Sequence, residues 1–154
     1  MNQQIVDVVV RHPKERLSKC SLTPLQGRKD LQFFRANPGF SFDATGYLLL
    51  DLDAPVISKT DGSLPILLLD STWKLLPTLM NCIAGSPVRR SLPRNLETAY
   101  PRKSKIEPDP MGGLASVEAL FAARMLMGRG TSELLDDYYW KGSFLDRNNF
   151  LKNS

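Results

Sequence analysis

The feature that most constrains the fold is the apolar run at residues 65–70, PILLLD. Successive side chains of a strand point to opposite faces of a sheet, so a continuous apolar run must be covered on both faces. Such runs are typical of parallel sheets. The runs at 5–10 (IVDVVV) and 47–52 (YLLLDL) indicate two further strands. The sequence therefore predicts an α/β fold, with a mainly parallel sheet flanked by helices.

Helices are expected after the third of these strands. A helix that Ser71 or Thr72 can cap comes next, and Pro77 keeps it short or kinks it. The clearest helical pattern in the chain covers residues 114–127, where apolar side chains recur along one side. Thr131 is the expected N-cap of a last helix with acidic residues near its start.

Two segments are harder to assign. Residues 31–42 fit either a strand or a turn. Residues 84–112 contain five prolines and are expected to form a long irregular segment, which in a compact domain is usually functional. A length of 154 residues fits a single domain. We expect an N-terminal segment, residues 1–45, packed on a core at 46–154.

Charge is distributed unevenly along the chain, whose net charge is +4. Six of the 20 basic residues lie in 11–30 and six more in 87–105, whereas 31–86 is net acidic. Because each phosphate neutralised by a basic side chain releases counterions, two segregated basic segments suit a polyanion such as RNA. The same pattern also fits two solvated basic loops, and charge alone leaves both interpretations open.

We expect a cytoplasmic protein with no membrane segment and no metal. No apolar run approaches the roughly 20 residues that a membrane-spanning helix needs. The N-terminal sequence has neither the basic start nor the small-residue cleavage site of a signal peptide. Cys20 and Cys82 lie far apart and neither forms a CxxC pair, which argues against a disulfide framework or a zinc site.

The end of the 65–70 strand carries the most suggestive polar residues. Open α/β sheets bind ligands beyond the carboxyl ends of their strands. Asp70 supplies a carboxylate there, two hydroxyls and the indole of Trp73 follow, and the N–H groups of a helix start suit an anionic group. An indole can also pack on a purine or a sulfonium. The alternative is a capped helix with a tryptophan in the core, and the residues alone do not exclude it.

Three blocks of the sequence resemble those of a known enzyme family. Leu-Asp-Ser-Thr-Trp at 69–73 resembles the Asp-Cys-Ser-Trp signature of the aminocarboxypropyltransferases that modify small-subunit ribosomal RNA, and also the Asp-Thr-Trp signature of DTW-domain transferases acting on tRNA. Segments 90–101 and 113–120 resemble two later blocks of the ribosomal group in the same order, and Lys-Cys-Ser at 19–21 is similar to its opening Lys-Cys-Thr. Ser71 replaces the cysteine of that signature, which is typical of a divergent member.

The resemblance implies a SPOUT-like fold with a C-terminal trefoil knot, in which S-adenosylmethionine lies between three loops. It implies that Trp73 packs against this cofactor and that Asp70 lies close to the transferred carbon. The other implied cofactor-binding residues are Ser21 near the amino-acid arm, the Leu69 carbonyl at the ribose, backbone at Leu76 near the methionine carboxylate, Leu52 and Leu92 at the adenine, and Leu114 in the same pocket.

The implied reaction moves the 3-amino-3-carboxypropyl group to a uridine or pseudouridine, in rRNA before tRNA, as a step of ribosome biogenesis. Asp70 either accepts the proton that the attacking nitrogen loses or is only a helix cap. A SPOUT-type methyltransferase and a non-catalytic RNA-binding assembly factor stay open as alternatives. We expect a monomer that binds RNA through basic residues near these blocks: Lys19, Arg28, Arg89, Arg90, Arg94, Arg102 and Lys103.

Three further features have simpler interpretations. His12 has no serine or cysteine partner that would indicate a triad, and we expect it on the surface or against RNA. Glu118 is interpreted as a carboxylate that favours the dipole of its helix. The aromatic cluster at 138–140 is expected in the core or at an interface rather than as a platform for stacked bases.

Overall fold

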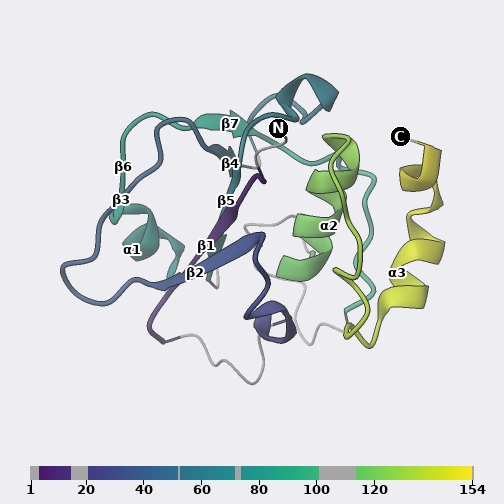
Figure 1. Cartoon of the computed structure of the whole chain (residues 1–154), viewed down its shortest axis with the longest axis horizontal. Coiled ribbons are helices and arrows are strands. Elements are labelled where there is room, and N and C mark those ends of the chain that lie inside the picture. Colours follow the sequence, from purple (N-terminus) through teal and green to yellow (C-terminus); the bar gives the residue numbers. More distant parts are fainter. Residues whose placement is uncertain (1–3, 15–20, 52, 72–73, 101–113, 154) are drawn as a thin grey trace.

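A five-stranded parallel sheet forms the centre of the computed structural model, which describes residues 4–14, 21–51, 53–71, 74–100 and 114–153 (Figure 1). The strands are β1 (Asp7–Arg11), β2 (Leu31–Arg35), β4 (Leu48–Leu50), β5 (Ile66–Asp70) and β7 (Val88–Arg90), in the order β2-β1-β5-β4-β7. Every strand pair of this sheet is parallel. The predicted mainly parallel sheet is confirmed, and all three expected strands are present.

The sheet is apolar on both faces, as the continuous run in β5 requires. Ile66 and Leu68 point into one cluster, together with Val9 of β1 and Leu120 of the helix α2 (Ser116–Leu126). Leu67 and Leu69 belong to a second cluster on the opposite face. All five residues of β5 are buried, and so are all five of β1. The alternation of side chains along each strand therefore divides the core into two halves.

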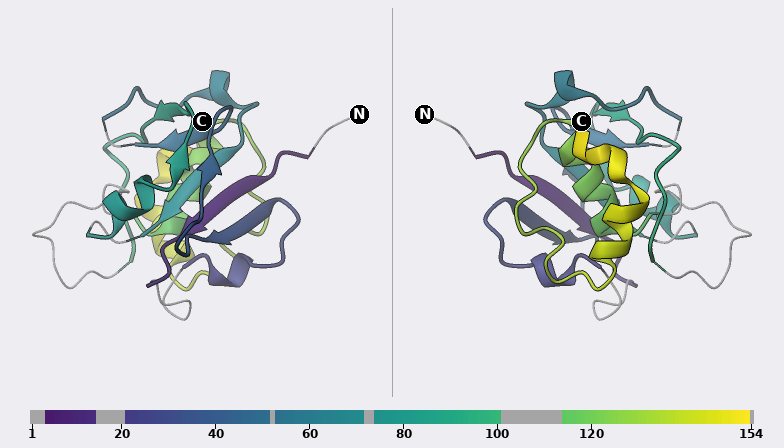
Figure 2. Two further views of the ribbon diagram at one scale, coloured as in Figure 1. Left: turned by 90° about the vertical axis from the view of Figure 1, so that its left-hand side faces the viewer. Right: turned by 90° about the vertical axis from the view of Figure 1, so that its right-hand side faces the viewer.

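Helices cover one half of this core more fully than the other. α2 packs on its face of the sheet, and α3 (Lys141–Arg147) lies over the outer side of α2 (Figure 2). The rings of Phe121 and Phe144 join these two helices edge to face, with centroids 6.2 Å apart. The described residues also form the short 3-10 helices η2 (Thr23–Leu25), η3 (Lys59–Asp61) and η4 (Asn149–Asn153).

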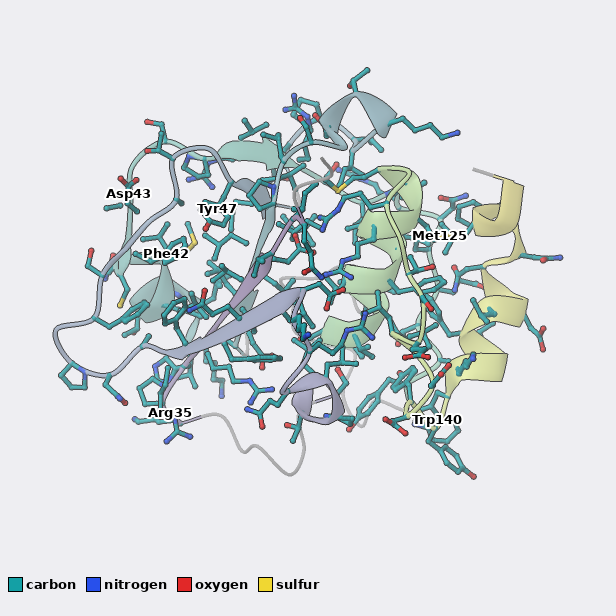
Figure 3. All side chains as sticks on the ribbon, viewed as in Figure 1. Arg35, Phe42, Asp43, Tyr47, Met125 and Trp140 are labelled. Atoms are coloured by element: carbon teal, nitrogen blue, oxygen red, sulfur yellow. The ribbon has the colours of Figure 1, made fainter. Side chains whose placement is uncertain are left out.

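The opposite face is covered by a single helical turn and by aromatic side chains. Helix α1 (Leu76–Met80) contributes the fully buried Leu79. Beside it, the two-residue strands β3 (Phe42–Asp43) and β6 (Ile83–Ala84) pair in parallel. Phe42 and Tyr47 meet edge to face, with ring centroids 5.1 Å apart (Figure 3). Helix α1 closely follows the end of β5 in the chain.

Two predicted helices need correction, whereas the one at 114–127 is confirmed by α2. The helix after β5 is as short as Pro77 implied, but Leu75 is its N-cap rather than Ser71 or Thr72. The helix expected from Thr131 is wrong: residues 131–140 form successive turns, and α3 begins only after Trp140.

The backbone of 131–140 explains this second difference. Leu134, Asp136 and Tyr138 donate N–H bonds to carbonyls three residues back rather than four. Glu133 has a left-handed backbone with φ of 64°, which breaks a right-handed helix.

Strand β7 lies inside the segment that the prolines led us to expect as irregular. Its sequence, Val-Arg-Arg, carries no apolar run. Among the described strands, β7 is the last of the sheet and pairs with β4. Its residues are partly exposed, so it needs no apolar run. Segment 31–42, which was ambiguous, begins with β2 and ends at β3.

Candidate functional site

The carboxyl ends of all five parallel strands meet at one edge of the sheet (Figure 1). Asp70, the last residue of β5, is register partner of Arg11, the last residue of β1. Both are buried, with 6% of Asp70 and 3% of Arg11 exposed. Arg11 Nε lies 3.2 Å from Asp70 Oδ2. The residue that the sequence singles out as the candidate catalytic group is therefore half of a buried ion pair.

The start of α2 comes to the same place. The Ser116 hydroxyl donates to Asp70 Oδ1 over 3.0 Å. The next residue, Val117, donates its backbone N–H to Ser21 Oγ, also over 3.0 Å. Ser21 thus caps α2 from a distant part of the chain, in the way that a local serine would. Asp70, Ser21 and the α2 N-terminus, predicted from three separate blocks, lie together.

Glu118 connects this helix start to the loop after β7. Its side chain is fully buried and accepts four hydrogen bonds. Oε1 accepts the Thr98 hydroxyl at 2.6 Å and the Ala115 N–H at 2.8 Å. Oε2 accepts the Ala99 N–H at 2.9 Å and the Tyr138 hydroxyl at 3.1 Å. Glu118 is more than the dipole-favouring carboxylate we expected, because it fixes residues 98–99 against the first turn of α2.

His12 was expected on the surface or against RNA. It is buried, directly after β1, which contradicts the surface position. Its backbone N–H donates to the Asp70 carbonyl at 3.2 Å, which extends the strand pairing by one residue. Its Nδ1 accepts the Lys14 N–H at 3.1 Å. Burial lowers the pKa of His12, and the charge of Lys14 lowers it further. The expectation failed because the strand pairing continues to the residue directly before Pro13.

The leucines expected to line a cofactor pocket divide between the two core clusters. Leu69 and Leu76 belong to the cluster on the α1 face. Leu92 and the buried Leu114 belong to the cluster on the α2 face. Leu114 directly precedes the first turn of α2, on the face of the Asp70–Ser116 contact, whereas the Leu69 side chain points to the opposite face and only its backbone adjoins Asp70. Leu52 and Trp73 lie outside the described residues.

The arginines expected to bind RNA are not all at this edge. Arg90 ends β7 and pairs with Asp61 at 3.3 Å, whereas Arg89 pairs with Asp51 at 3.1 Å. Arg94, four residues beyond β7, is exposed. Lys19, Arg102 and Lys103 lie outside the described residues.

Arg28 lies at the opposite edge, where the strands begin. Its guanidinium donates to both oxygens of Asp30, at 2.8 and 2.9 Å. Asp30 also accepts a bond from the buried Arg124 at 2.9 Å. The bond from Arg28 lowers the pKa of Asp30 below its usual range, and Arg124 adds to the effect. The structure therefore separates Arg28 from the basic residues that follow β7.

Sequence reasoning placed residues 112–116 at the site but missed Arg11. Arg11 stood out only as one of six basic residues in a segment interpreted as a loop. One usable signal was the position of Arg11 directly after the apolar run at 5–10. Asp70 stands in the same way at the end of the apolar run at 65–70. In a parallel sheet, residues at such positions reach the same edge.

Two other kinds of site are absent from the described residues. Among the helices that they form, none is long and apolar enough to cross a membrane. Within the same ranges, histidine, cysteine and acidic side chains form no group of three that could hold a metal ion.

The aromatic cluster at 138–140 is only partly in the core. Tyr138 and Trp140 pack against the core, whereas 86% of Tyr139 is exposed.

Comparison with known proteins gives one line of support. Neither the protein-family models nor the curated proteins contain a match to this chain. Among solved structures, the chain is similar to the SAM-dependent rRNA:acp-transferase Tsr3 from Vulcanisaeta distributa. The TM-score is 0.71 at 24% sequence identity, and the likeness covers 97% of this chain and 82% of Tsr3. The chain therefore has an α/β fold, with a mainly parallel sheet, similar to that of Tsr3.

Proposed function

We propose that this protein is a transferase that moves the 3-amino-3-carboxypropyl group of S-adenosylmethionine to a uridine or pseudouridine of ribosomal RNA. The observation that carries the proposal is the meeting of Asp70, Ser21 and the start of α2 at the carboxyl edge of the sheet. These residues come from the blocks whose sequences resemble the rRNA aminocarboxypropyltransferases. The fold likeness to Tsr3, an enzyme of that activity, supports the same interpretation.

The residues at this edge fit S-adenosylmethionine in chemical terms. The adenosyl part needs apolar surface, which Leu92 and Leu114 supply together with the proposed Leu52 and Trp73. The Leu69 carbonyl is proposed to meet the ribose. The methionine part carries a carboxylate, which suits backbone N–H groups at a helix start, and Leu76 is the first residue of α1. Ser21 supplies a hydroxyl beside the helix that contacts Asp70.

Bound S-adenosylmethionine supplies a carbon made electrophilic by its sulfonium, and methylthioadenosine is the leaving group. The leaving group is neutral, so the protein needs to orient the reactants more than to donate a proton. Asp70 takes the proton that the attacking N–H of the base releases. Its fixed position at the end of a buried strand holds the accepting oxygens at one place. Exposed Arg94, with Arg89 and Arg90, attracts the phosphates around the target base.

We further propose the knot that the resemblance implies, together with the cellular setting and the oligomeric state that we expected from the sequence. Ser91 donates its N–H to the Pro55 carbonyl and its hydroxyl to the Ala54 carbonyl, and its own carbonyl accepts the Ile57 N–H. The chain leaving β7 thus runs along the loop after β4, as a continuation of the β4–β7 pairing, and the knot is proposed from the family resemblance. We propose a monomer that acts on RNA in the cytoplasm during ribosome biogenesis.

Two labelled forms of S-adenosylmethionine test the proposed function. The purified protein is incubated with rRNA from cells that lack it, with label in either the methionine carboxyl carbon or the methyl carbon. We expect carboxyl label in the RNA and methylthioadenosine as the released product. Methyl label in the RNA with release of adenosylhomocysteine would show a methyltransferase instead. Absence of S-adenosylmethionine binding by calorimetry would leave only an RNA-binding role.

A further inference from the structure

We propose that Arg11 is a positioning residue for the transfer, which acts by holding the Asp70 carboxylate in one orientation at the end of β5. This inference rests on the proposed function, because it assigns a second residue to the same site. Arg11 belongs to none of the three sequence blocks that suggested the activity.

Strand register places the two residues side by side before any side chain is considered. Arg11 and Asp70 are the last paired residues of neighbouring parallel strands. The alternation along β1 sends Val9 and Arg11 to the α2 face, and that along β5 sends Leu68 and Asp70 to the same face. The guanidinium and the carboxylate therefore meet beneath α2, with Nε 3.2 Å from Oδ2.

Arg11 is itself held by groups other than Asp70, so that its position is fixed. Its guanidinium carbon lies 4.7 Å from the centre of the Phe33 ring on β2. Such a cation over an aromatic face is attracted to the ring and restrained by it. Nη2 points to Thr23 Oγ1 at 3.5 Å. Residues of β2 and of the turn η2 thus hold the cation that meets Asp70.

The carboxylate is then fixed through both of its oxygens. Arg11 Nε forms an ion pair with Oδ2 at 3.2 Å that lacks hydrogen-bond geometry, and the Ser116 hydroxyl donates a hydrogen bond to Oδ1 at 3.0 Å. A planar group held at both ends cannot rotate about its last bond without breaking one of these interactions. Burial of a carboxylate is costly unless it is paired and hydrogen-bonded. Arg11 therefore both keeps Asp70 in place and balances its charge.

The role of Arg11 predicts that its removal matters only while Asp70 is present. We expect Arg11→Ala to lower kcat by about 100-fold, the size of effect that misplacement of a reacting group can have. The KM for S-adenosylmethionine should change little, because Arg11 is buried behind the carboxylate. In the Asp70→Asn background, Arg11→Ala should lower kcat no further, since effects of residues that act as a unit are not additive. Arg11→Lys, which keeps the charge, should restore part of the rate.

A matched control separates positioning from loss of stability. Arg129 Nη1 forms an ion pair of 2.8 Å with the buried Asp7 at the opposite edge of the same sheet. Arg129→Ala should lower the midpoint of urea unfolding while leaving kcat unchanged. Equal losses of kcat in Arg11→Ala and Arg129→Ala, or additive losses in Arg11→Ala/Asp70→Asn, would overturn the inference.

Unfolding measurements on the same variants give a readout that needs no activity. The cycle of Arg11→Ala and Asp70→Asn should show a coupling on the order of tenfold in the folding equilibrium constant, as contacting residues do. Coupling in stability together with an inactive wild type would mean that the proposed function has failed although the pair is real. An active wild type with no coupling in either cycle would mean that the inference has failed and the function stands.

Discussion

Ser21 accepts the backbone N–H of Val117 across 96 positions of sequence, and so caps helix α2 from the N-terminal part of the chain. Most N-cap residues precede their helix directly, but here Ala115 occupies the N-cap position and has no side chain that could serve. Ser21 takes over this task. The helix start that contacts Asp70 through Ser116 therefore depends on a residue from another segment.

Removal of this cap should loosen the helix start. We expect Ser21→Ala to lower the free energy of unfolding by about 1 kcal/mol, the usual cost of a lost N-cap. Affinity for S-adenosylmethionine should fall as well, because the same residue borders the proposed site. Urea unfolding and calorimetry measure the two effects. Ser63→Ala, at an exposed serine, is the control; equal behaviour of the two variants would contradict the assignment.

Trp73 lies outside the described residues, and its role is proposed from the resemblance of the 69–73 signature. We expect Trp73→Ala to weaken S-adenosylmethionine binding by about 1–3 kcal/mol, as loss of one aromatic stacking partner does. RNA binding should stay nearly unchanged. Calorimetry with the cofactor, alongside an RNA-binding titration, measures both. An unaltered cofactor affinity in a folded Trp73→Ala variant would refute the assignment.

The arginines after and within β7 should determine the salt dependence of RNA binding. Replacing Arg89, Arg90 and Arg94 together should flatten the log–log salt slope by roughly 0.7–0.9 for each phosphate that the variant no longer binds. Arg94 should contribute most, because Arg89 and Arg90 already pair with Asp51 and Asp61. Cofactor affinity should hardly change.

A salt titration of RNA binding compares the wild type, the triple variant and Lys29→Ala. Lys29 is exposed and lies beside Asp30, at the edge where the strands begin. The Lys29→Ala slope should match that of the wild type. Parallel slopes for wild type and triple variant would mean that these arginines do not meet phosphate.

Acid should destabilise the protein through Asp30. The bonds from Arg28, and then Arg124, hold the pKa of Asp30 below its ordinary value of 3.8. The unfolded chain therefore binds the proton more readily, so this stabilising effect is complete above pH 3.8 and is lost as the pH falls below it. Asp30→Asn should lower the free energy of unfolding by about 1.5–3 kcal/mol at neutral pH, the value of hydrogen bonds to a charged group. The loss should be smaller in acid below pH 3.8. Urea unfolding at neutral pH and in acid measures the two losses, with the exposed Asp53→Asn as control. An equal loss of stability for Asp30→Asn at both pH values would contradict this role of Asp30.

The sequence predicted the central strands and α2 because their apolar patterns are strong. β5 and β1 are buried on both faces, and strands buried in this way have near-continuous apolar runs. β7 was missed because an edge strand needs no apolar run. The helix expected from Thr131 failed because a capping residue and acidic neighbours describe how a helix would start, not whether the backbone continues it.

The site was predicted in part for a related reason. Asp70 could be found because it ends the strongest strand and stands in a recognisable signature. The place of Arg11 directly after an apolar run was a signal, but its pairing with Asp70 depends on the strand order and register that bring β1 beside β5. Glu118 was visible as a helix carboxylate, but its contacts with residues 98–99 and Tyr138 exist only after the chain has folded.

The exclusively parallel pairing of the main sheet has a consequence for how the chain folds. Parallel neighbours cannot be joined by a tight hairpin, so each pair requires a long loop to close first. β1 and β5 pair although they lie far apart in the sequence: 59 positions separate Asp7 from Ile66. Folding should therefore be slow for a chain of this size, since long-range contacts retard the crossing of the barrier. During synthesis β1 would emerge before the other described strands and could pair early with β2. Its other edge would stay unpaired until β5 has emerged from the ribosome.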